Sequence, residues 1–192
     1  ATAALTGLGY VDPGELEVPV GISESKFDCD GLDPDCFCGI DIQFYPTGTE
    51  IGCGGWTTYN EQPSNASTLD EMLEGLLDGS YVPPEVLAGS TTLEFTGGNM
   101  AGALPELKLL YDARKDENDE WETTVAVYAA DDCANPSGEI EIVGFTKVAI
   151  TAVLAPPDGQ LIQATITCEK FEEGRGGGSN LGVIGSIPNL VQ

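Results

Sequence analysis

Six cysteines and no histidine define the chemistry open to this chain of 192 residues. Without an imidazole, Ser-His-Asp and Cys-His catalysis, His-ligated zinc and acid-base catalysis by histidine are all excluded. An even number of cysteines in a small acidic chain predicts disulfide bonds formed in an oxidising compartment. The cysteines fall into a dense upstream group and a distant pair, in chain order Cys29, Cys36, Cys38, Cys53, Cys133 and Cys168.

Zinc binding is the alternative use of these cysteines, but the only close pair is Cys36-x-Cys38, which is tighter than the spacing of zinc ligands. We therefore predict disulfides. Cys133 and Cys168 follow two strands of the same expected sheet, and their bond would tie the first strand to the last. Because Cys36 and Cys38 are too close to bond to each other without strain, the preferred upstream pairs are Cys29–Cys36 and Cys38–Cys53. The crossed arrangement stays open.

Alternate aspartates around Gly31 predict a calcium site formed by Asp28, Asp30, Asp33 and Asp35. Several carboxylates in a glycine-containing loop can supply the six to eight oxygens typical of calcium sites. The pattern is not an EF-hand, because the glycine is misplaced and the bidentate glutamate is absent. In so acidic a chain, the alternative is a solvated loop. The acidic run 116–120 is a second candidate, with a hairpin tip as its alternative.

The charge balance is extreme, with 32 Asp and Glu against 7 Lys and Arg. A surface that is negative almost everywhere excludes nucleic acid and anionic membranes as partners. It favours divalent cations and basic proteins as partners, because they bridge carboxylates. It also favours a solution of high salt concentration, which screens them. The alternative interpretation of the composition is a surface adapted to high salt.

Hydrophobic periodicity predicts two short helices. Over 67–78 the apolar residues recur with the spacing of one helix face, Thr68 and Glu71 form a capping box with Ser67 or Thr68 as the N-cap, and Gly79 ends the helix. A second helix is predicted over 105–113, where a proline stands at the first position and Leu107, Leu110 and Tyr111 share a face.

Strands dominate the remainder of the chain. Alternating Val, Ile and Thr patterns bounded by turn residues predict strands over 40–45, 91–95, 121–130, 139–146, 147–155 and 160–168. Short turns between consecutive strands favour antiparallel pairing. The expected fold is α+β, a mainly antiparallel, sandwich-like β-sheet with one or two short helices and disulfide staples. Residues 1–20 are expected to form an extended arm, 21–173 a single domain, and 174–192 a glycine-rich hinge and an apolar tail.

No apolar run approaches the length of roughly 18 to 20 residues that crosses a bilayer. The sequence opens on a segment of small residues rather than on methionine, as a chain does after a leader or an anchor has been removed. We therefore expect a secreted protein located outside the cell or on its surface, with no membrane segment in the mature chain.

Several short motifs together resemble the extracellular part of Tad (tight adherence) pilus-assembly proteins of the TadG-like group. In chain order these motifs occupy residues 20–24, 44–46, 52–56, 95–98, 132–136, 142–145, 174–178 and 185–191. The resemblance implies a bacterial protein that is exported by way of an N-terminal hydrophobic segment and is associated with surface filaments, adhesion or their assembly. It implies no catalytic site. Proteins of that group usually begin with a pilin-like membrane helix, which this sequence lacks.

Two apolar segments flank the expected domain and could pair with the sheet edge of a neighbour, an interaction that satisfies backbone donors and acceptors on both partners. The residues expected to make these contacts are Ala4, Leu5, Leu8, Ile187, Leu190 and Val191. The alternative is that both segments pack on their own domain.

Together these features predict a structural subunit of a filament or adhesion apparatus, without enzymatic activity, whose partners are other copies of itself or pilus proteins. A calcium-dependent carbohydrate-binding module is the alternative, in which Trp56 with Tyr59 and Trp121 with Tyr128 could stack on sugars. A glycoside hydrolase with a carboxylate pair is the remaining enzyme class, although nothing in the order of the acidic residues marks such a pair.

Overall fold

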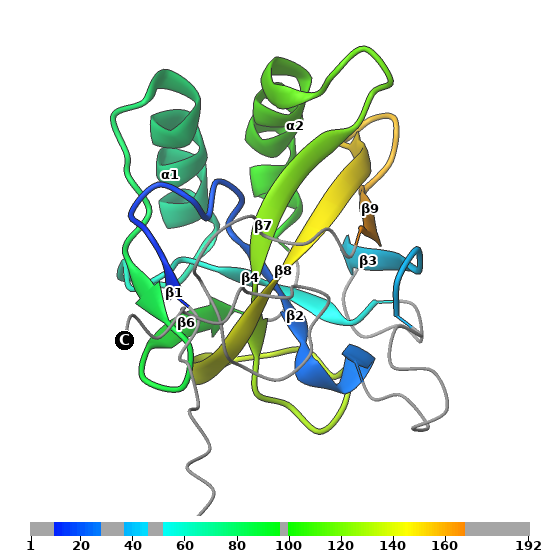
Figure 1. Cartoon of the computed structure of the whole chain (residues 1–192). Helices are drawn as coiled ribbons and strands as arrows, with labels where there is room; N and C mark the ends of the chain where they lie inside the picture. The colour runs from blue at the N-terminus through cyan, green and yellow to red at the C-terminus, as the bar shows by residue number, and fades with distance from the viewer. Residues whose placement is uncertain (1–9, 28–36, 46–51, 97–99, 168–192) are drawn as a thin grey trace, which may run out of the picture.

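The computed structural model describes residues 10–27, 37–45, 52–96 and 100–167. These residues form a β-rich body with two short α-helices (Figure 1). The strands are β1 (Tyr10–Val11), β2 (Val20–Ser23), β3 (Asp41–Tyr45), β4 (Gly54–Thr57), β5 (Val86–Leu87), β6 (Thr92–Thr96), β7 (Trp121–Tyr128), β8 (Gly138–Leu154) and β9 (Leu161–Ile166). The helices are α1 (Ala66–Asp78) and α2 (Leu104–Arg114), with 3-10 turns at Glu24–Phe27 and Ala101–Ala103.

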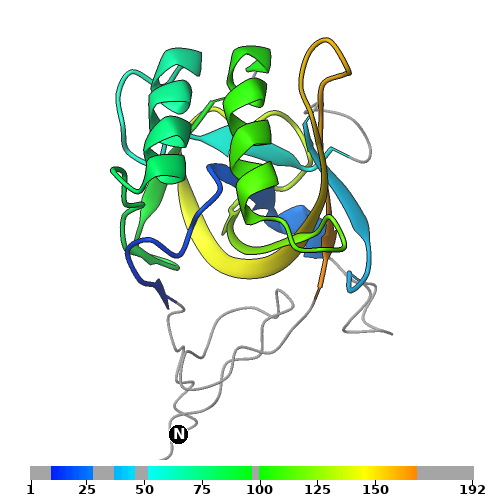
Figure 2. The same ribbon diagram turned by 90° about the horizontal axis from the view of Figure 1, so that it is seen from above.

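Seven strands form one sheet in the order β3-β9-β8-β6-β4-β2-β7, and β8 pairs with β7 as well. This second pairing closes β8, β6, β4, β2 and β7 into a ring. Closure is possible because β8 is long and strongly curved (Figure 2). Its first residues pair with β6, with Glu141 opposite Thr92. Its later residues pair with β7, with Ile150 opposite Trp121. Strands β1 and β5 form a separate two-stranded sheet.

The predicted fold class is confirmed: the described chain is mostly β-sheet, with two short helices and a disulfide bond. Two features go beyond the prediction. The ring is closed, and β2 pairs with β7 in parallel whereas the other pairs are antiparallel. The predicted division of 139–155 into two strands is wrong, because Thr146 and Lys147 both pair with β7 within the continuous strand β8.

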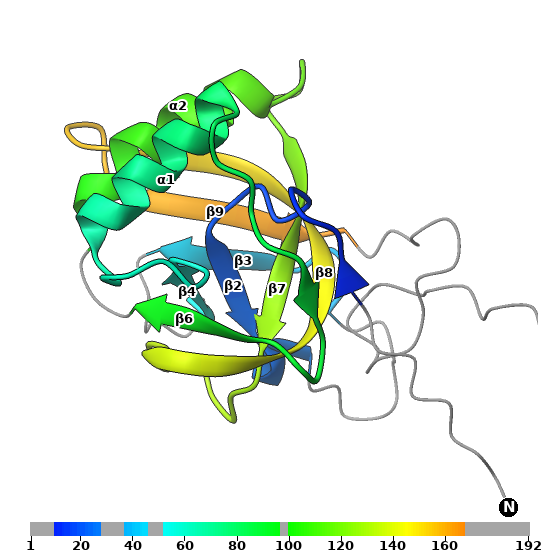
Figure 3. The same ribbon diagram turned by 90° about the vertical axis from the view of Figure 1, so that its left-hand side faces the viewer.

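Both helices lie side by side on one side of the sheet (Figures 1 and 3). The predicted end of α1 is confirmed, because Gly79 adopts a left-handed conformation with φ of 81°. Its predicted beginning is wrong. Asn65 is the N-cap, and its side chain accepts a hydrogen bond from the Thr68 N–H at 3.1 Å. Asparagine is as good an N-cap as serine, so Asn65 competes with Ser67 and Thr68 for the position.

The core consists of two clusters of buried side chains on opposite faces of the strands. On β7, Val125 and Val127 belong to the first cluster, whereas Ala126 and Tyr128 belong to the second. This alternation buries both faces of β7. The helices add Leu73 and other apolar residues to the first cluster.

Residues 10–20 are part of the folded body. Val11, Leu16 and Val18 are buried, and the Gly14 N–H donates to the Pro83 carbonyl at 3.0 Å. The described half of the expected N-terminal arm therefore packs against its own domain. Among the described residues, no helix has both the length and the apolar character needed to span a membrane.

A disulfide bond joins Cys53 to Cys133, with their Cα atoms 4.4 Å apart. The predicted bonds Cys133–Cys168 and Cys38–Cys53 are therefore wrong. Cys53 directly precedes β4, Cys133 follows β7, and both flank the end of β2, where the Ser23 hydroxyl donates to the Asp132 carbonyl at 2.7 Å. Only the non-local β4-β2-β7 order brings these two cysteines together.

The remaining cysteines are only partly within the described chain. Cys38 is disulfide-bonded, and because the other two described cysteines bond to each other, its partner lies outside the described residues. Cys29, Cys36 and Cys168 also lie outside them. The preferred pair Cys29–Cys36 stays a prediction.

Candidate assembly surface

The predicted calcium ligands Asp28, Asp30, Asp33 and Asp35 lie outside the described residues, so the site stays a prediction. Within the described ranges, no group of three or more cysteine, aspartate or glutamate side chains is arranged to hold a metal ion. The second candidate, the acidic run 116–120, lies within these ranges.

The acidic run 116–120 is a turn that satisfies its own backbone. The Asp116 carboxylate accepts hydrogen bonds from the N–H groups of Asn118 at 2.8 Å and Glu120 at 3.0 Å. These backbone hydrogen bonds lower the pKa of Asp116 below its usual value, and the bond from the Glu120 N–H has the larger effect. Lys115 forms an ion pair with Asp119 at 2.7 Å. The run connects α2 to β7, so it is a turn between a helix and a strand and not the tip of a β-hairpin.

The aromatic side chains that could have stacked on sugars are buried. Trp56 and Tyr128 are 0% exposed, Tyr59 is 1% exposed and Trp121 is 3% exposed. Tyr59 donates a hydrogen bond to the Leu16 carbonyl, and Phe95 packs on Tyr128 with ring centroids 4.6 Å apart. These four rings support the core and offer no platform to a glycan.

Asp70 on α1 has two carboxylates near enough to affect its pKa, Glu74 on the same helix and Glu106 on α2. Burial raises the pKa of Asp70 above its ordinary value, and the carboxylates of Glu106 and Glu74 raise it further. One carboxylate oxygen of Asp70 is buried without a hydrogen-bond partner. A raised pKa means that the folded state prefers the protonated form. Asp70 therefore destabilises the fold when the pH is above its folded pKa, and this penalty disappears as the pH falls through that value.

We expect the Asp70→Asn variant to have a higher free energy of unfolding than the wild type at pH 7, because the amide carries no charge to bury. The gain should shrink at pH 4. Denaturant titrations at the two pH values measure it. Asp78→Asn on the same helix is the matched control, because hydrogen bonds from Ser80 lower the pKa of Asp78. That variant should lose stability at pH 7, and a gain in both variants would contradict the assignment.

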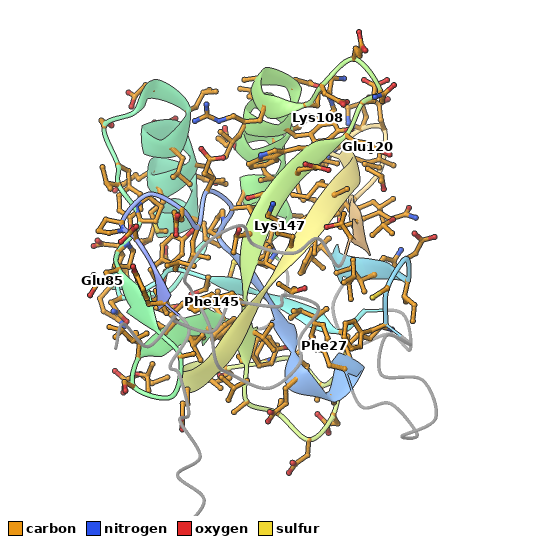
Figure 4. The ribbon with its side chains drawn as sticks, in the orientation of Figure 1. Phe27, Glu85, Lys108, Glu120, Phe145 and Lys147 are labelled. Atoms are coloured by element: carbon orange, nitrogen blue, oxygen red, sulfur yellow. A yellow bond between two sulfur atoms is a disulfide. The ribbon has the colours of Figure 1, made fainter. Side chains whose placement is uncertain are left out.

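Basic residues are concentrated on α2 and directly after it. Lys108, Arg114 and Lys115 are three of the seven basic residues of the chain. Lys108 pairs with Asp112, which lies one turn further along the helix. Arg114 lies 3.7 Å from Glu17. Such exposed ion pairs add little stability. The three basic side chains do reduce the net negative charge of this end of the molecule. Figure 4 shows Lys108 on α2 and Glu120 before β7.

Acidic residues are absent from two parts of the chain. All 32 aspartates and glutamates lie between Asp12 and Glu173, so residues 1–11 and 174–192 contain none. We call these two stretches the acid-free segments. The only charged side chain in either of them is Arg175. The predicted assembly residues Ala4, Leu5, Leu8, Ile187, Leu190 and Val191 all belong to the acid-free segments, and they lie outside the described residues.

The body connects to both acid-free segments on the same side. β1 begins at Tyr10, within the first segment, and β9 ends at Ile166, near the end of the described chain. In Figure 3, β1 and the end of β9 both lie on the right, whereas the turn between β8 and β9 lies on the far left. Tyr10 is paired across strands with Leu87, and the two side chains are 39% and 38% exposed.

Opposite to β1, a shallow groove of about 330 Å³ opens between α2 and the β8–β9 turn. Leu109 is 58% exposed and Leu154 is 36% exposed. The groove is lined by Pro105, Lys108, Leu109, Leu154, Ala155, Pro156 and Asp158. Sequence reasoning missed this groove. One signal was available: Leu109 is an apolar residue that stands off the buried face formed by Leu107, Leu110 and Tyr111.

No family model, curated protein or solved structure matches this chain. The resemblance to TadG-like proteins therefore stays a prediction from the motifs, and the proposals below depend on the residues themselves.

Proposed function

We propose that the protein is a non-enzymatic structural subunit of an extracellular filament or Tad-like adhesion apparatus, and that copies assemble by exchanging strands or tails. The observation that carries this proposal is the separation of charge along the chain. Every carboxylate side chain belongs to the stretch that contains the folded body, and the acid-free segments that flank it are apolar and nearly uncharged.

Charge separation matters because two bodies of this composition repel each other. The chain has a net charge of −25, and contact between two such surfaces places like charges close together. A segment without carboxylates avoids this penalty. It can bury apolar side chains and pair its backbone with a neighbour while the two acidic bodies stay apart. The acid-free segments are therefore the parts of the chain best suited to bind a second copy.

The described body suits a structural role. Its ring of strands is closed, its Cys53–Cys133 disulfide joins the flanks of β2, and its aromatic side chains are used for packing. A disulfide is also typical of proteins from oxidising compartments, which supports an extracellular location. A carbohydrate-binding module or a glycoside hydrolase would need a different surface, and nothing in the described residues favours either.

We expect purified protein to form large assemblies that grow when salt is raised from about 0.1 M to 1 M, because the Debye length then falls from about 10 Å to 3 Å. Light scattering with size-exclusion chromatography measures the mass, and negative-stain microscopy shows the form. Leu5→Asp and Leu190→Asp each place a carboxylate in an acid-free segment and should weaken assembly about tenfold or more.

The matched control is Ser67→Asp, which adds the same charge at an exposed position in the first turn of α1, where a negative charge is favourable. This variant should assemble as the wild type does. A wild type that stays monomeric at high concentration in 1 M salt would contradict the proposal. Glycan binding that EDTA abolishes would instead support the carbohydrate-binding alternative.

A further inference from the structure

The groove between α2 and the β8–β9 turn has the properties of a docking site for an apolar peptide. Five of its seven lining residues are apolar, and two of these, Leu109 and Leu154, are exposed leucines on different elements. Exposed leucines gathered around one depression mark an interaction site more strongly than the same residues scattered singly. Leu77 on α1 is an exposed leucine that does not line this groove.

Charge also distinguishes the groove from the rest of the acidic body. Its lining contains one acid, Asp158, and one base, Lys108. An uncharged segment can enter this site without bringing a carboxylate near Asp158, whereas most other parts of the chain cannot. Residues 181–191 carry no charge and contain six branched apolar residues, Leu181, Val183, Ile184, Ile187, Leu190 and Val191. These residues match the groove because they are both apolar and uncharged.

The location of the groove relative to the end of the described chain suits a segment supplied by a second copy. β9 runs away from the groove for six residues, which is about 20 Å of strand, before the described chain ends. The linking residues 168–180 can extend the chain by up to about 45 Å. The described chain therefore ends on the side opposite to the groove (Figure 3), and a segment that continues from there can reach a neighbour.

We infer that the groove formed by α2 and the β8–β9 turn binds residues 181–191 of a second copy, in a head-to-tail contact. This inference rests on the proposed function and identifies its acceptor site. Because the described chain ends on the side opposite to the groove, donor and acceptor are different parts of each copy, and the contact is heterologous. A heterologous contact repeats from copy to copy and builds an open filament unless the rotation closes a ring.

The first test places a carboxylate in the groove. Leu109→Glu changes a side chain that is 58% exposed, so the fold should tolerate it. We expect assembly to weaken about tenfold or more, since an apolar contact is lost and a charge enters. Leu77→Glu, a change of the same kind on α1 outside the groove, is the matched control and should assemble normally. Circular dichroism of both variants checks that they fold.

The second test distinguishes head-to-tail binding from any other arrangement. The Leu109→Glu variant keeps an intact tail, and the Leu190→Asp variant keeps an intact groove. Each variant alone should stay largely monomeric. An equimolar mixture should form dimers that contain one copy of each variant and do not grow, because only one complementary pair of sites remains. Native mass spectrometry measures this composition.

The outcomes separate the inference from the proposed function. Wild-type filaments together with normal assembly of Leu109→Glu would overturn the inference and leave the proposed function standing. A mixture that yields no heterodimer would also overturn it. A monomeric wild type in which Leu109→Glu releases residues 181–191 to protease would mean that the tail binds its own groove, and this would overturn both. Loss of assembly in Leu109→Glu with heterodimers in the mixture would support it.

Discussion

Replacing Cys53 and Cys133 together by serine will lower the free energy of unfolding by about 4 kcal/mol, which is a large part of the stability of a domain of this size. The two cysteines are 80 residues apart in sequence. Without their bond, the unfolded chain gains the freedom of a long open loop, and the entropy of that loop is the main source of the loss. Guanidinium titration of the double variant measures the effect.

The bond also holds a non-local junction, because it joins the flanks of β2 where the strand meets both β4 and β7. Ser25→Ala is the control, since its hydroxyl lies 3.7 Å from the Cys53 sulfur and 3.6 Å from the Cys133 sulfur but forms no covalent bond. We expect this variant to lose about 1 kcal/mol or less. A double cysteine variant as stable as Ser25→Ala would show that the ring of strands does not depend on the bond.

Gly54→Ala should destabilise the fold by about 3 kcal/mol, a large effect for the addition of one methyl group. A Cβ atom at this position would lie 2.5 Å from a ring carbon of Phe44, 3.0 Å from the Gly21 carbonyl oxygen and 3.1 Å from the Phe44 Cα. Two of these three atoms belong to the backbone, so no change of rotamer removes the conflict. The strands β2, β3 and β4 would have to move apart.

Gly102→Ala is the matched control for this change. The nearest atom to its Cβ would be the Ala66 Cβ at 3.9 Å, which is an ordinary contact, and Gly102 does not have a positive φ. Alanine at such a position is neutral or slightly stabilising, because it restricts the unfolded chain. Thermal unfolding of both variants measures the difference. Equal melting temperatures would mean that β3 and β4 approach each other less closely than described.

The effect on assembly should differ from the effect on stability. Neither Cys53 nor Gly54 lines the proposed groove. Variants that remain folded at low temperature should therefore still form filaments there, whereas Leu109→Glu should remain stable and fail to assemble. This contrast separates residues that build the subunit from residues that join subunits.

Sequence reasoning succeeded where the signal was local. The periodic leucines of α1, the glycine that ends it and the alternating residues of β7 each act over a few neighbouring residues, and the structure confirms these elements. The N-cap was missed because Asn65, Ser67 and Thr68 are all good caps, and pattern alone does not rank them. The break placed between Thr146 and Lys147 was wrong because both halves of β8 pair with the same strand, β7.

The candidate assembly site divides in the same way. Both acid-free segments are visible in the printed sequence, since they follow from composition alone. The groove is not, because Leu109 and Leu154 are 45 positions apart by number and become neighbours only when α2 packs beside the end of β8. The burial of Trp56 and Trp121 was also undecided in the sequence, because an aromatic residue in a strand can face either the core or the solvent.

The amino-acid sequence by itself thus determined the element types, the β-rich class, the presence of disulfides and the separation of charge, because each depends on residue type and short-range spacing. Only the tertiary structure decided that β8 closes the ring, that β2 lies parallel to β7, and that Cys53 bonds to Cys133. These features depend on which strand edges meet across long stretches of chain, and many such pairings are compatible with one hydrophobic pattern.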